Sequence, residues 1–109
     1  MNGQFTMSEI TVLAINTIVS NPKIRNGRPI IAGTTLRVQD IVAAHGFRGY
    51  TPEEIVHQYP TITLAQVHAA LAYYYEHQAV IDQQMDEDEQ FARNAKDKGL
   101  GQRHPPVLR

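Results

Sequence analysis

The sequence predicts a small, mainly helical domain with a short β element on its N-terminal side. Two capping sequences, Thr51-Pro52-Glu53-Glu54 and Thr63-Leu64-Ala65-Gln66, each predict the start of a helix. A short turn over residues 60–63 separates the two helices. Upstream, Asn26–Val38 combines turn residues with the β-branched pair Ile30-Ile31, which favours a strand. Together these features predict a helix-turn-helix-like trihelical core that follows a β-hairpin.

The composition is that of one globular domain with a tail. The chain has 109 residues, of which 42% are hydrophobic and 19% charged, and it contains no cysteine. The lack of cysteine excludes a disulfide framework, thiolate catalysis and a zinc finger. No segment has the features of a signal peptide, and none approaches the roughly 20 apolar residues of a membrane span. We therefore expect a cytoplasmic protein that does not associate with a membrane.

The strands are expected in the N-terminal part of the chain. Residues 1–17 form an N-terminal extension, and the β-branched run Ile10–Val19 predicts one strand or two. Asn21-Pro22 ends this run, because proline cannot donate to a β-ladder. Residues 23–31 would then form a hairpin around the turn Asn26-Gly27. The unpaired edge of the first strand would pair with a second copy, so we expect a homodimer.

Two short helices are expected next. The first begins at Val38, where the apolar spacing becomes helical, and ends at Gly46, a residue typical of helix C-termini. The second follows the N-cap Thr51 with proline at its first position, and Pro60 ends it after about two turns.

The third helix is expected to be the longest. It begins after Thr63, and helicity continues through the charged segment Asp82–Lys98. Residues 18–81 are therefore the predicted helix-turn-helix domain, and residues 82–109 an acidic helix with a flexible C-terminal tail. The predicted apolar face of the third helix consists of Leu64, Val67, Leu71, Tyr74, Tyr75 and Ile81.

Several short motifs occur in an order that resembles a known bacterial family. They are Ser20-Asn21-Pro22, Asn26-Gly27-Arg28-Pro29-Ile30-Ile31, Gly33-Thr34, Val38, Thr51-Pro52-Glu53-Glu54-Ile55, Tyr59-Pro60 and Leu71-Ala72-Tyr73. Over about residues 18–78 the chain thereby resembles the family named domain of unknown function 433. The resemblance implies a homeodomain-like fold and an antitoxin that binds a nuclease toxin related to the PIN-domain ribonucleases. Thr35 departs from the family's pattern, which has arginine after Gly-Thr, so no role of that arginine is implied here.

The charges are divided along the chain. Residues 1–50 carry a net charge of +3, residues 51–92 carry −8 and residues 93–109 carry +4. The predicted second and third helices hold no lysine or arginine before residue 93, so they lack the phosphate contacts that a DNA-reading helix needs. A nucleic-acid surface would instead lie in the N-terminal half, although a basic turn is equally an ordinary solvated surface. Its residues would be Lys23, Arg25, Arg28 and Arg37.

The C-terminal segment is the predicted partner-binding region. Its acidic run would attract a basic, ribonuclease-like toxin, and the basic residues beyond would reach acidic groups of that toxin. The alternative is that these charges serve solubility alone. A tyrosine of the third helix that lies off the apolar face would anchor the interface. The predicted partner-binding residues are Tyr73, Asp86, Glu87, Arg93 and Lys96.

Nothing in the sequence supports catalysis. It shows no nucleophile–base pair, phosphate-binding loop or metal-ligand cluster. The five histidines have no i, i+4 pairing, so we expect neither a metal site nor another cofactor.

These observations and the resemblance predict an antitoxin of a type II toxin–antitoxin pair. It would neutralise a nuclease toxin and would also repress its own operon by binding operator DNA. Two alternatives stay open, a stand-alone DNA-binding regulator and a small dimeric interaction domain that binds no nucleic acid.

Overall fold

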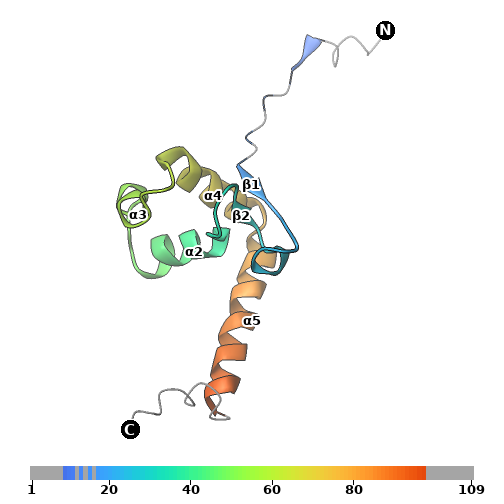
Figure 1. The fold of residues 1–109 in the computed structure, drawn as a ribbon, viewed down its shortest axis with the longest axis vertical. Helices are drawn as coiled ribbons and strands as arrows, with labels where there is room; N and C mark the ends of the chain where they lie inside the picture. Colours follow the sequence, from blue (N-terminus) through green and yellow to red (C-terminus); the bar gives the residue numbers. More distant parts are fainter. Residues whose placement is uncertain (1–8, 12, 14, 16, 98–109) are drawn as a thin grey trace.

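A small sheet and a set of helices make up the part of the chain that the computed structural model describes, residues 9–11, 13, 15 and 17–97 (Figure 1). The chain is mainly helical, as predicted, with one two-stranded antiparallel sheet near its N-terminal side. In order, the elements are β1 (Ile18–Val19), the turn η1 (Arg25–Gly27), β2 (Ile30–Ile31), α2 (Val38–Val42), the π-helical segment η2 (Ala43–Phe47), α3 (Pro52–Gln58), α4 (Leu64–Glu76) and α5 (Gln78–Asp97).

The sheet is shorter than the sequence predicts. Ile18 pairs with Ile31, and Val19 pairs with Ile30. Both residues of β2 are buried, whereas in β1 Ile18 is half-buried and Val19 is exposed. The sheet therefore contributes the two isoleucines of β2 to the core and ties the start of the domain to it.

The strand predicted to begin at Ile10 is wrong over most of the described positions. Ile10, Leu13 and Ile15 are 55%, 87% and 77% exposed, and none of them lies in a strand. β-branched residues form a strand where a partner strand is available. Pro29 and Gly33 flank β2 and limit that partner to two residues.

The turn at Asn26-Gly27 is present, but it does not close the predicted hairpin. Arg25, Asn26 and Gly27 have φ of 51°, 59° and 77°, and together they form one left-handed turn. A two-residue hairpin turn would have strands on both sides, which this turn lacks. The Ser20 hydroxyl donates to the Gly27 carbonyl at 2.7 Å and holds the turn near the end of β1. The predicted hairpin within residues 23–31 is therefore wrong, because β1 and β2 pair around this longer loop.

Both predicted capping boxes are confirmed. The Thr51 hydroxyl accepts from the amide of Glu54 at 3.1 Å, and the Glu54 carboxylate accepts from the amide of Thr51 at 2.8 Å. Thr63 and Gln66 make the same two bonds at 3.2 and 2.8 Å. Each box satisfies amides that have no partner inside the helix. The starts of α3 and α4 are thus fixed by local side chains.

The first helix begins at Val38, as predicted, but helical structure does not end at Gly46. The wider turns of η2 continue through Phe47, and Gly49, with φ of 73°, takes the left-handed conformation. The buried Ala44 accepts from the amide of Tyr50 at 3.0 Å. This bond keeps the chain attached to the core beyond the position where a glycine stop was expected.

The predicted third helix is two helices, α4 and α5. The break is at His77, whose φ of −130° and ψ of 34° are not helical. Its amide lies 3.0 Å from the carbonyls of both Tyr73 and Tyr74, and its ring Nδ1 lies 3.0 Å from the Tyr73 carbonyl. A side chain that bonds to the backbone of the preceding turn competes with continuation of the helix. After the break, α5 runs away from the other helices (Figure 1).

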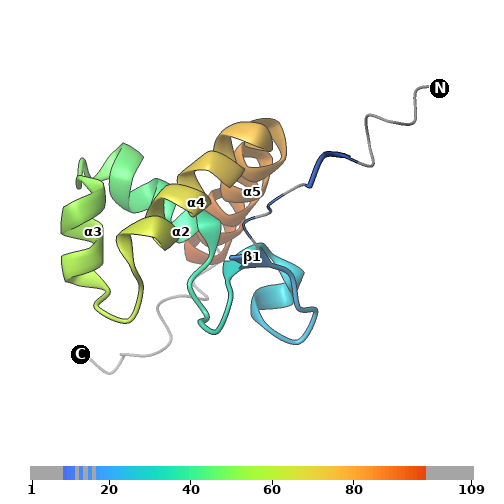
Figure 2. The same cartoon turned by 90° about the horizontal axis from the view of Figure 1, so that it is seen from above.

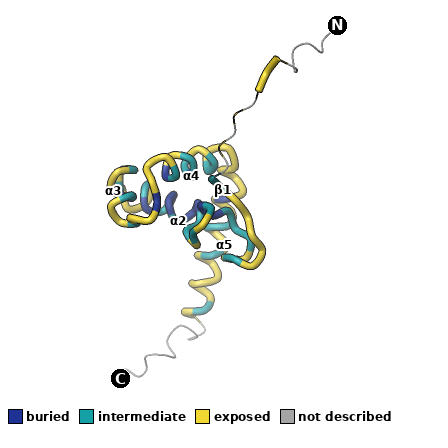
Figure 3. Tube along the Cα trace, turned by 45° about the horizontal axis from the view of Figure 1, so that its top comes forward, coloured by how far each residue is buried: buried dark blue, intermediate teal, exposed yellow. Residues whose placement is uncertain are grey.

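The core lies between α2, α3 and α4, with β2 on one side. α2 and α3 both pack against α4 (Figures 1 and 2), and the buried positions of the chain lie at the centre of this group (Figure 3). A homeodomain-like description of the group stays a prediction. The buried cluster consists of Ile31, Val38, Ile41, Val42, Ala44, Ile55, Ile62, Val67, Ala70 and Ile81.

The predicted apolar face of the third helix is partly confirmed. Val67 and Ile81 are buried, and Leu71 and Tyr74 pack against the core. Two of its predicted members are exposed instead, Leu64 at 40% and Tyr75 at 65%.

Neighbouring residues on α5 provide a test of how this helix is held. Ile81 is 2% exposed and Val80 is 55% exposed. We expect Ile81→Ala to lower the free energy of unfolding by about 2–5 kcal/mol, because it empties a buried site. The matched change Val80→Ala should shift it by no more than about 0.5 kcal/mol. Urea unfolding followed by circular dichroism measures both, and equal effects would mean that α5 does not dock through Ile81.

Candidate functional site

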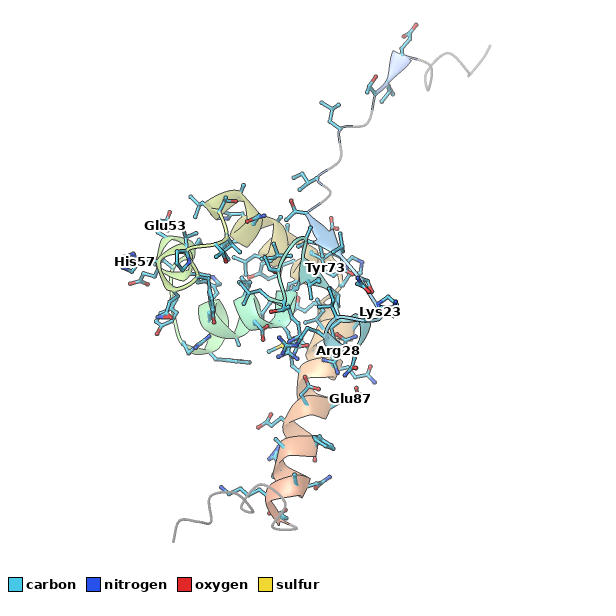
Figure 4. The ribbon with its side chains drawn as sticks, in the orientation of Figure 1. Lys23, Arg28, Glu53, His57, Tyr73 and Glu87 are labelled. Atoms are coloured by element: carbon cyan, nitrogen blue, oxygen red, sulfur yellow. The ribbon has the colours of Figure 1, made fainter. Side chains whose placement is uncertain are left out.

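Three arginines from separate elements lie close together beside α5. Arg25 belongs to η1, Arg28 precedes β2 and Arg37 is the N-cap of α2. The backbone brings them together, because the amide of Val38 donates to the Pro29 carbonyl at 2.9 Å. Figure 4 shows Arg28 next to α5, on the side from which Lys23 projects further out.

Arg28 forms a two-bond fork with Asp88 of α5. Its Nη1 donates to Oδ2 of Asp88 at 3.1 Å, and its Nη2 donates to Oδ1 at 3.0 Å. Gln39, only 8% exposed, connects to both partners. Its Oε1 accepts from Arg28 Nη1 at 2.7 Å, and its Nε2 donates to Asp88 Oδ2 at 2.9 Å. One carboxylate of α5 therefore receives three hydrogen bonds from residues more than 45 positions earlier in the chain.

Arg37 is held mainly by Asp40, one turn into its own helix. Arg37 Nη2 donates to Asp40 Oδ1 at 2.9 Å, and the Arg37 amide donates to Asp40 Oδ2 at 2.9 Å. Its Nη1 lies 3.7 Å from Asp88 Oδ2. Arg25 lies further out, where its Nη1 donates to the Thr35 carbonyl at 3.0 Å and lies 3.9 Å from Asp40. Three arginines thus share two carboxylates.

The network acts on the ionisation of Asp88. Hydrogen bonds from Arg28 and then from Gln39 lower the pKa of the Asp88 carboxyl below its ordinary value, against the smaller effect of desolvation. On the same helix, Asp82 accepts from the Tyr74 hydroxyl at 2.7 Å, and this bond raises the pKa of Tyr74. At neutral pH, Asp88 is therefore a stable anion inside a ring of donors.

The structure brings together three of the four residues predicted to bind nucleic acid. Arg25, Arg28 and Arg37 form one cluster, and Lys23 lies exposed on the preceding loop. Sequence reasoning missed the polar partners of this cluster, Gln39, Asp40 and Asp88. The opposite charges of residues 1–50 and 51–92 are the feature of the sequence that is consistent with such pairing.

The predicted partner-binding residues lie on two helices, Tyr73 on α4 and the other four on α5. The Tyr73 ring stacks on His77 with centroids 4.0 Å apart, and it packs against the core, so the prediction that it points away from the core is wrong. Glu87 accepts from Gln83 at 3.3 Å, and Arg93 lies 3.4 Å from Glu89. Asp86 lines a groove, and Lys96 is exposed near the end of α5.

The groove lies between the α2–η2 segment, α4 and α5 and has a volume of about 950 Å³. Its apolar lining includes Phe47 and Tyr75, which are 78% and 65% exposed. Three carboxylates of α5 line the groove, Asp82, Asp86 and Glu89, at positions one helical turn apart. We call this hollow the acidic groove. Its lining is Val42, His45, Gly46, Phe47, Leu71, Tyr74, Tyr75, Gln78, Asp82, Met85, Asp86 and Glu89.

The sequence matches the family described as protein of unknown function (DUF433) over residues 18–74, about half of the chain. The chain belongs to the DUF433 family. Arg25, Arg28, Arg37 and Gln39 lie within the DUF433 segment, whereas α5 and Asp88 follow it.

The DUF433 fold is also found in a solved structure. A crystal structure of a DUF433 member protein from Anabaena variabilis is similar to this chain, with a TM-score of 0.61 and 24% sequence identity. The likeness covers 79% of this chain and 99% of that one, and it shows the fold alone. No curated protein matches the sequence.

Two further findings concern other kinds of site. Among residues 9–11, 13, 15 and 17–97 of this DUF433 protein, no group of three or more histidine, cysteine, aspartate or glutamate side chains could hold a metal ion. No helix within the same residues is long and apolar enough to cross a membrane.

Asp88 should contribute to stability in a pH-dependent way. Its folded pKa is lower than its ordinary value of 3.8, so the contribution is fully present above that value and is lost as the pH falls through the lowered pKa. We expect Asp88→Asn to cost about 1 kcal/mol at pH 7, a small value because the pair is partly exposed to solvent. Unfolding of both proteins across the acid range measures this.

The exposed neighbour Asp86→Asn is the matched control, since no ion pair of Asp86 occurs among the described residues. The two variants should differ at pH 7, and Asp88→Asn should converge with the wild type below the lowered pKa. A constant difference at every pH would contradict the assigned role of the Asp88 charge.

Proposed function

We propose that this protein is an antitoxin-like interaction protein that binds and neutralises a nuclease toxin in the cytoplasm. The observation that carries the proposal is the outer half of α5. Between Asp88 and Asp97 no residue is buried, and Phe91 is 76% exposed. Large aromatic side chains are the residues that most often anchor an interface with another protein.

The faces of α5 support this proposal. Ile81, Met85 and Asp88 lie on the face that contacts the core, and helical spacing continues this face to Phe91 and Ala95. The apolar face therefore extends past the end of the core. A helix that is not packed along its length is marginal in water, so a partner seated there would stabilise it.

The acidic groove supports a basic partner. Its exposed aromatic residues, Phe47 and Tyr75, offer apolar contact area, and the carboxylates on α5 would attract a positively charged surface. Nucleases that hold polyanionic RNA commonly carry such surfaces. The resemblance to antitoxins of the DUF433 family favours the same assignment.

A second function, repression of the protein's own operon, rests on the clustered arginines. Arg25, Arg28 and Arg37 approach one another on the DUF433 segment, as a phosphate-binding surface requires. A stand-alone DNA-binding regulator would use the same residues. A dimeric interaction domain that binds no nucleic acid is the third candidate. The strand edge that was expected to pair with a second copy is only the two residues of β1, Ile18–Val19.

Co-expression with the product of the adjacent gene tests the antitoxin assignment. We expect a stable complex, relief of toxicity, and a loss of affinity of at least about tenfold for Phe91→Ala, because aromatic anchors dominate interfaces. Val80→Ala, which removes an exposed apolar side chain from the other half of α5, should change the affinity by less than about twofold. A neighbour that is neither bound nor toxic would remove the antitoxin assignment.

A further inference from the structure

The arginines beside α5 are held in place by residues other than Asp88. Gln39 Oε1 accepts from Arg28 at 2.7 Å, and Asp40 accepts from Arg37 at 2.9 Å. Gln39 and Asp40 both belong to α2, which is part of the core. The donors directed at Asp88 would therefore keep their positions if Asp88 moved away.

The group that these donors hold is an anion with two oxygens. Arg28 binds it through both Nη atoms at 3.0 and 3.1 Å, and Gln39 adds a third donor at 2.9 Å. An arginine fork fits phosphate oxygens as well as carboxylate oxygens. The Asp88 side chain is 41% exposed, so the position is open to a ligand from solvent.

Within the described residues, Asp88 is also the residue nearest the C-terminal end of α5 that forms an ion pair with the core. Toward the N-terminal end, α5 is anchored by the buried Ile81 and by the Asp82–Tyr74 hydrogen bond. Beyond Asp88, the ion pair that the structure shows is Arg93–Glu89, within α5 itself. Release of Asp88 thus requires only that the outer half of α5 bends or frays, while Ile81 stays buried.

The surroundings favour duplex DNA over single-stranded nucleic acid. Single strands are commonly bound by stacking of unpaired bases on aromatic side chains. The sequence from Ser20 to Asp40, which supplies Lys23 and the three arginines, contains no aromatic residue. A basic segment that carries no aromatic residue of its own is suited to backbone phosphates of a duplex.

We propose that Arg28, Arg37 and Gln39 form a binding site for a backbone phosphate of duplex DNA, and that Asp88 occupies this site while α5 is docked. The helix and the DNA then compete for one set of donors. Arg25 and Lys23, on the same side of the domain, extend the contact to neighbouring phosphates. The inference rests on the DNA-binding part of the proposed function and is independent of the toxin.

The test compares variants of the full chain in binding to a short DNA duplex from the region upstream of its gene, by fluorescence anisotropy. We expect Asp88→Asn to bind about fivefold more tightly than the wild type at low salt, with a salt dependence steeper by about one released counterion. Asp86→Asn removes the same charge from α5 without touching the arginines, and it should change the affinity by less than about twofold. The double variant Asp88→Asn with Arg28→Ala should lose the gain.

A second measurement uses the wild-type protein and so does not depend on how a variant folds. Bound duplex should increase hydrogen exchange in the outer half of α5, residues 88–97, and leave α4 unchanged. Circular dichroism checks the fold of Asp88→Asn, and Asp88→Ser gives a second way to remove the carboxylate.

Four results would overturn the inference. They are equal affinities for Asp88→Asn and Asp86→Asn, a gain that persists without Arg28, unchanged exchange in α5, and preference for a single-stranded RNA of the same length. Inorganic phosphate that binds Asp88→Asn as tightly as the duplex would make this a small-anion site and would also overturn it. If the wild type and both variants bind no duplex, the DNA-binding part of the proposed function fails too, whereas a failed toxin complex leaves this inference intact.

Discussion

The Arg28–Asp88 ion pair joins the two oppositely charged parts of the chain. Arg28 stands in the N-terminal basic part and Asp88 in the acidic part, sixty positions later. An isolated exposed pair contributes little to stability, but this one is a two-bond fork that also satisfies the buried amide of Gln39. Without it, Gln39 would keep one donor unpaired near the core, and α5 would lose its outermost attachment.

The direction of α5 follows from where these attachments end. Ile81 is buried, Met85 packs on the core and Asp88 reaches Arg28. The next residue on that face, Phe91, is 76% exposed because no element of the core lies opposite it. The same helix therefore has an inner half that belongs to the domain and an outer half that is available to a partner.

Local features of the fold could be predicted from the sequence, and non-local ones could not. The capping boxes at Thr51 and Thr63 involve residues three positions apart, so their sequence determines them directly. The strand predicted within Ile10–Val19 is confirmed only at Ile18–Val19, because a strand depends on its partner and β2 has two residues. The break at His77 was not predicted, because no glycine or proline marks it and its cause is a bond between the histidine ring and the preceding turn.

The candidate site shows the same limit. The division of charge along the sequence was enough to select the arginines, because basic residues predominate in the N-terminal half. Their partners depend on the packing of α5 over the start of α2, which places Asp88 and Gln39 2.9 Å apart across 49 positions. Tyr73 illustrates the opposite error, since a residue judged by helical spacing to point outward is packed against the core and its ring stacks on His77 at 4.0 Å. Helical spacing predicts faces of one helix, but which face is buried depends on the neighbours.

If the outer half of α5 and the arginines are separate binding surfaces, the Asp88 contact couples them. A partner that bound α5 and drew Asp88 away from Arg28 would leave the arginine donors without their anion, so their affinity for phosphate would rise. Thermodynamic linkage requires that bound phosphate raise the affinity of α5 for that partner by the same factor. The factor cannot exceed what the Asp88 contact itself contributes, and about 1 kcal/mol corresponds to about fivefold. Coupling of this size would be strong enough to change how much phosphate and partner are bound, and too weak to unfold the domain.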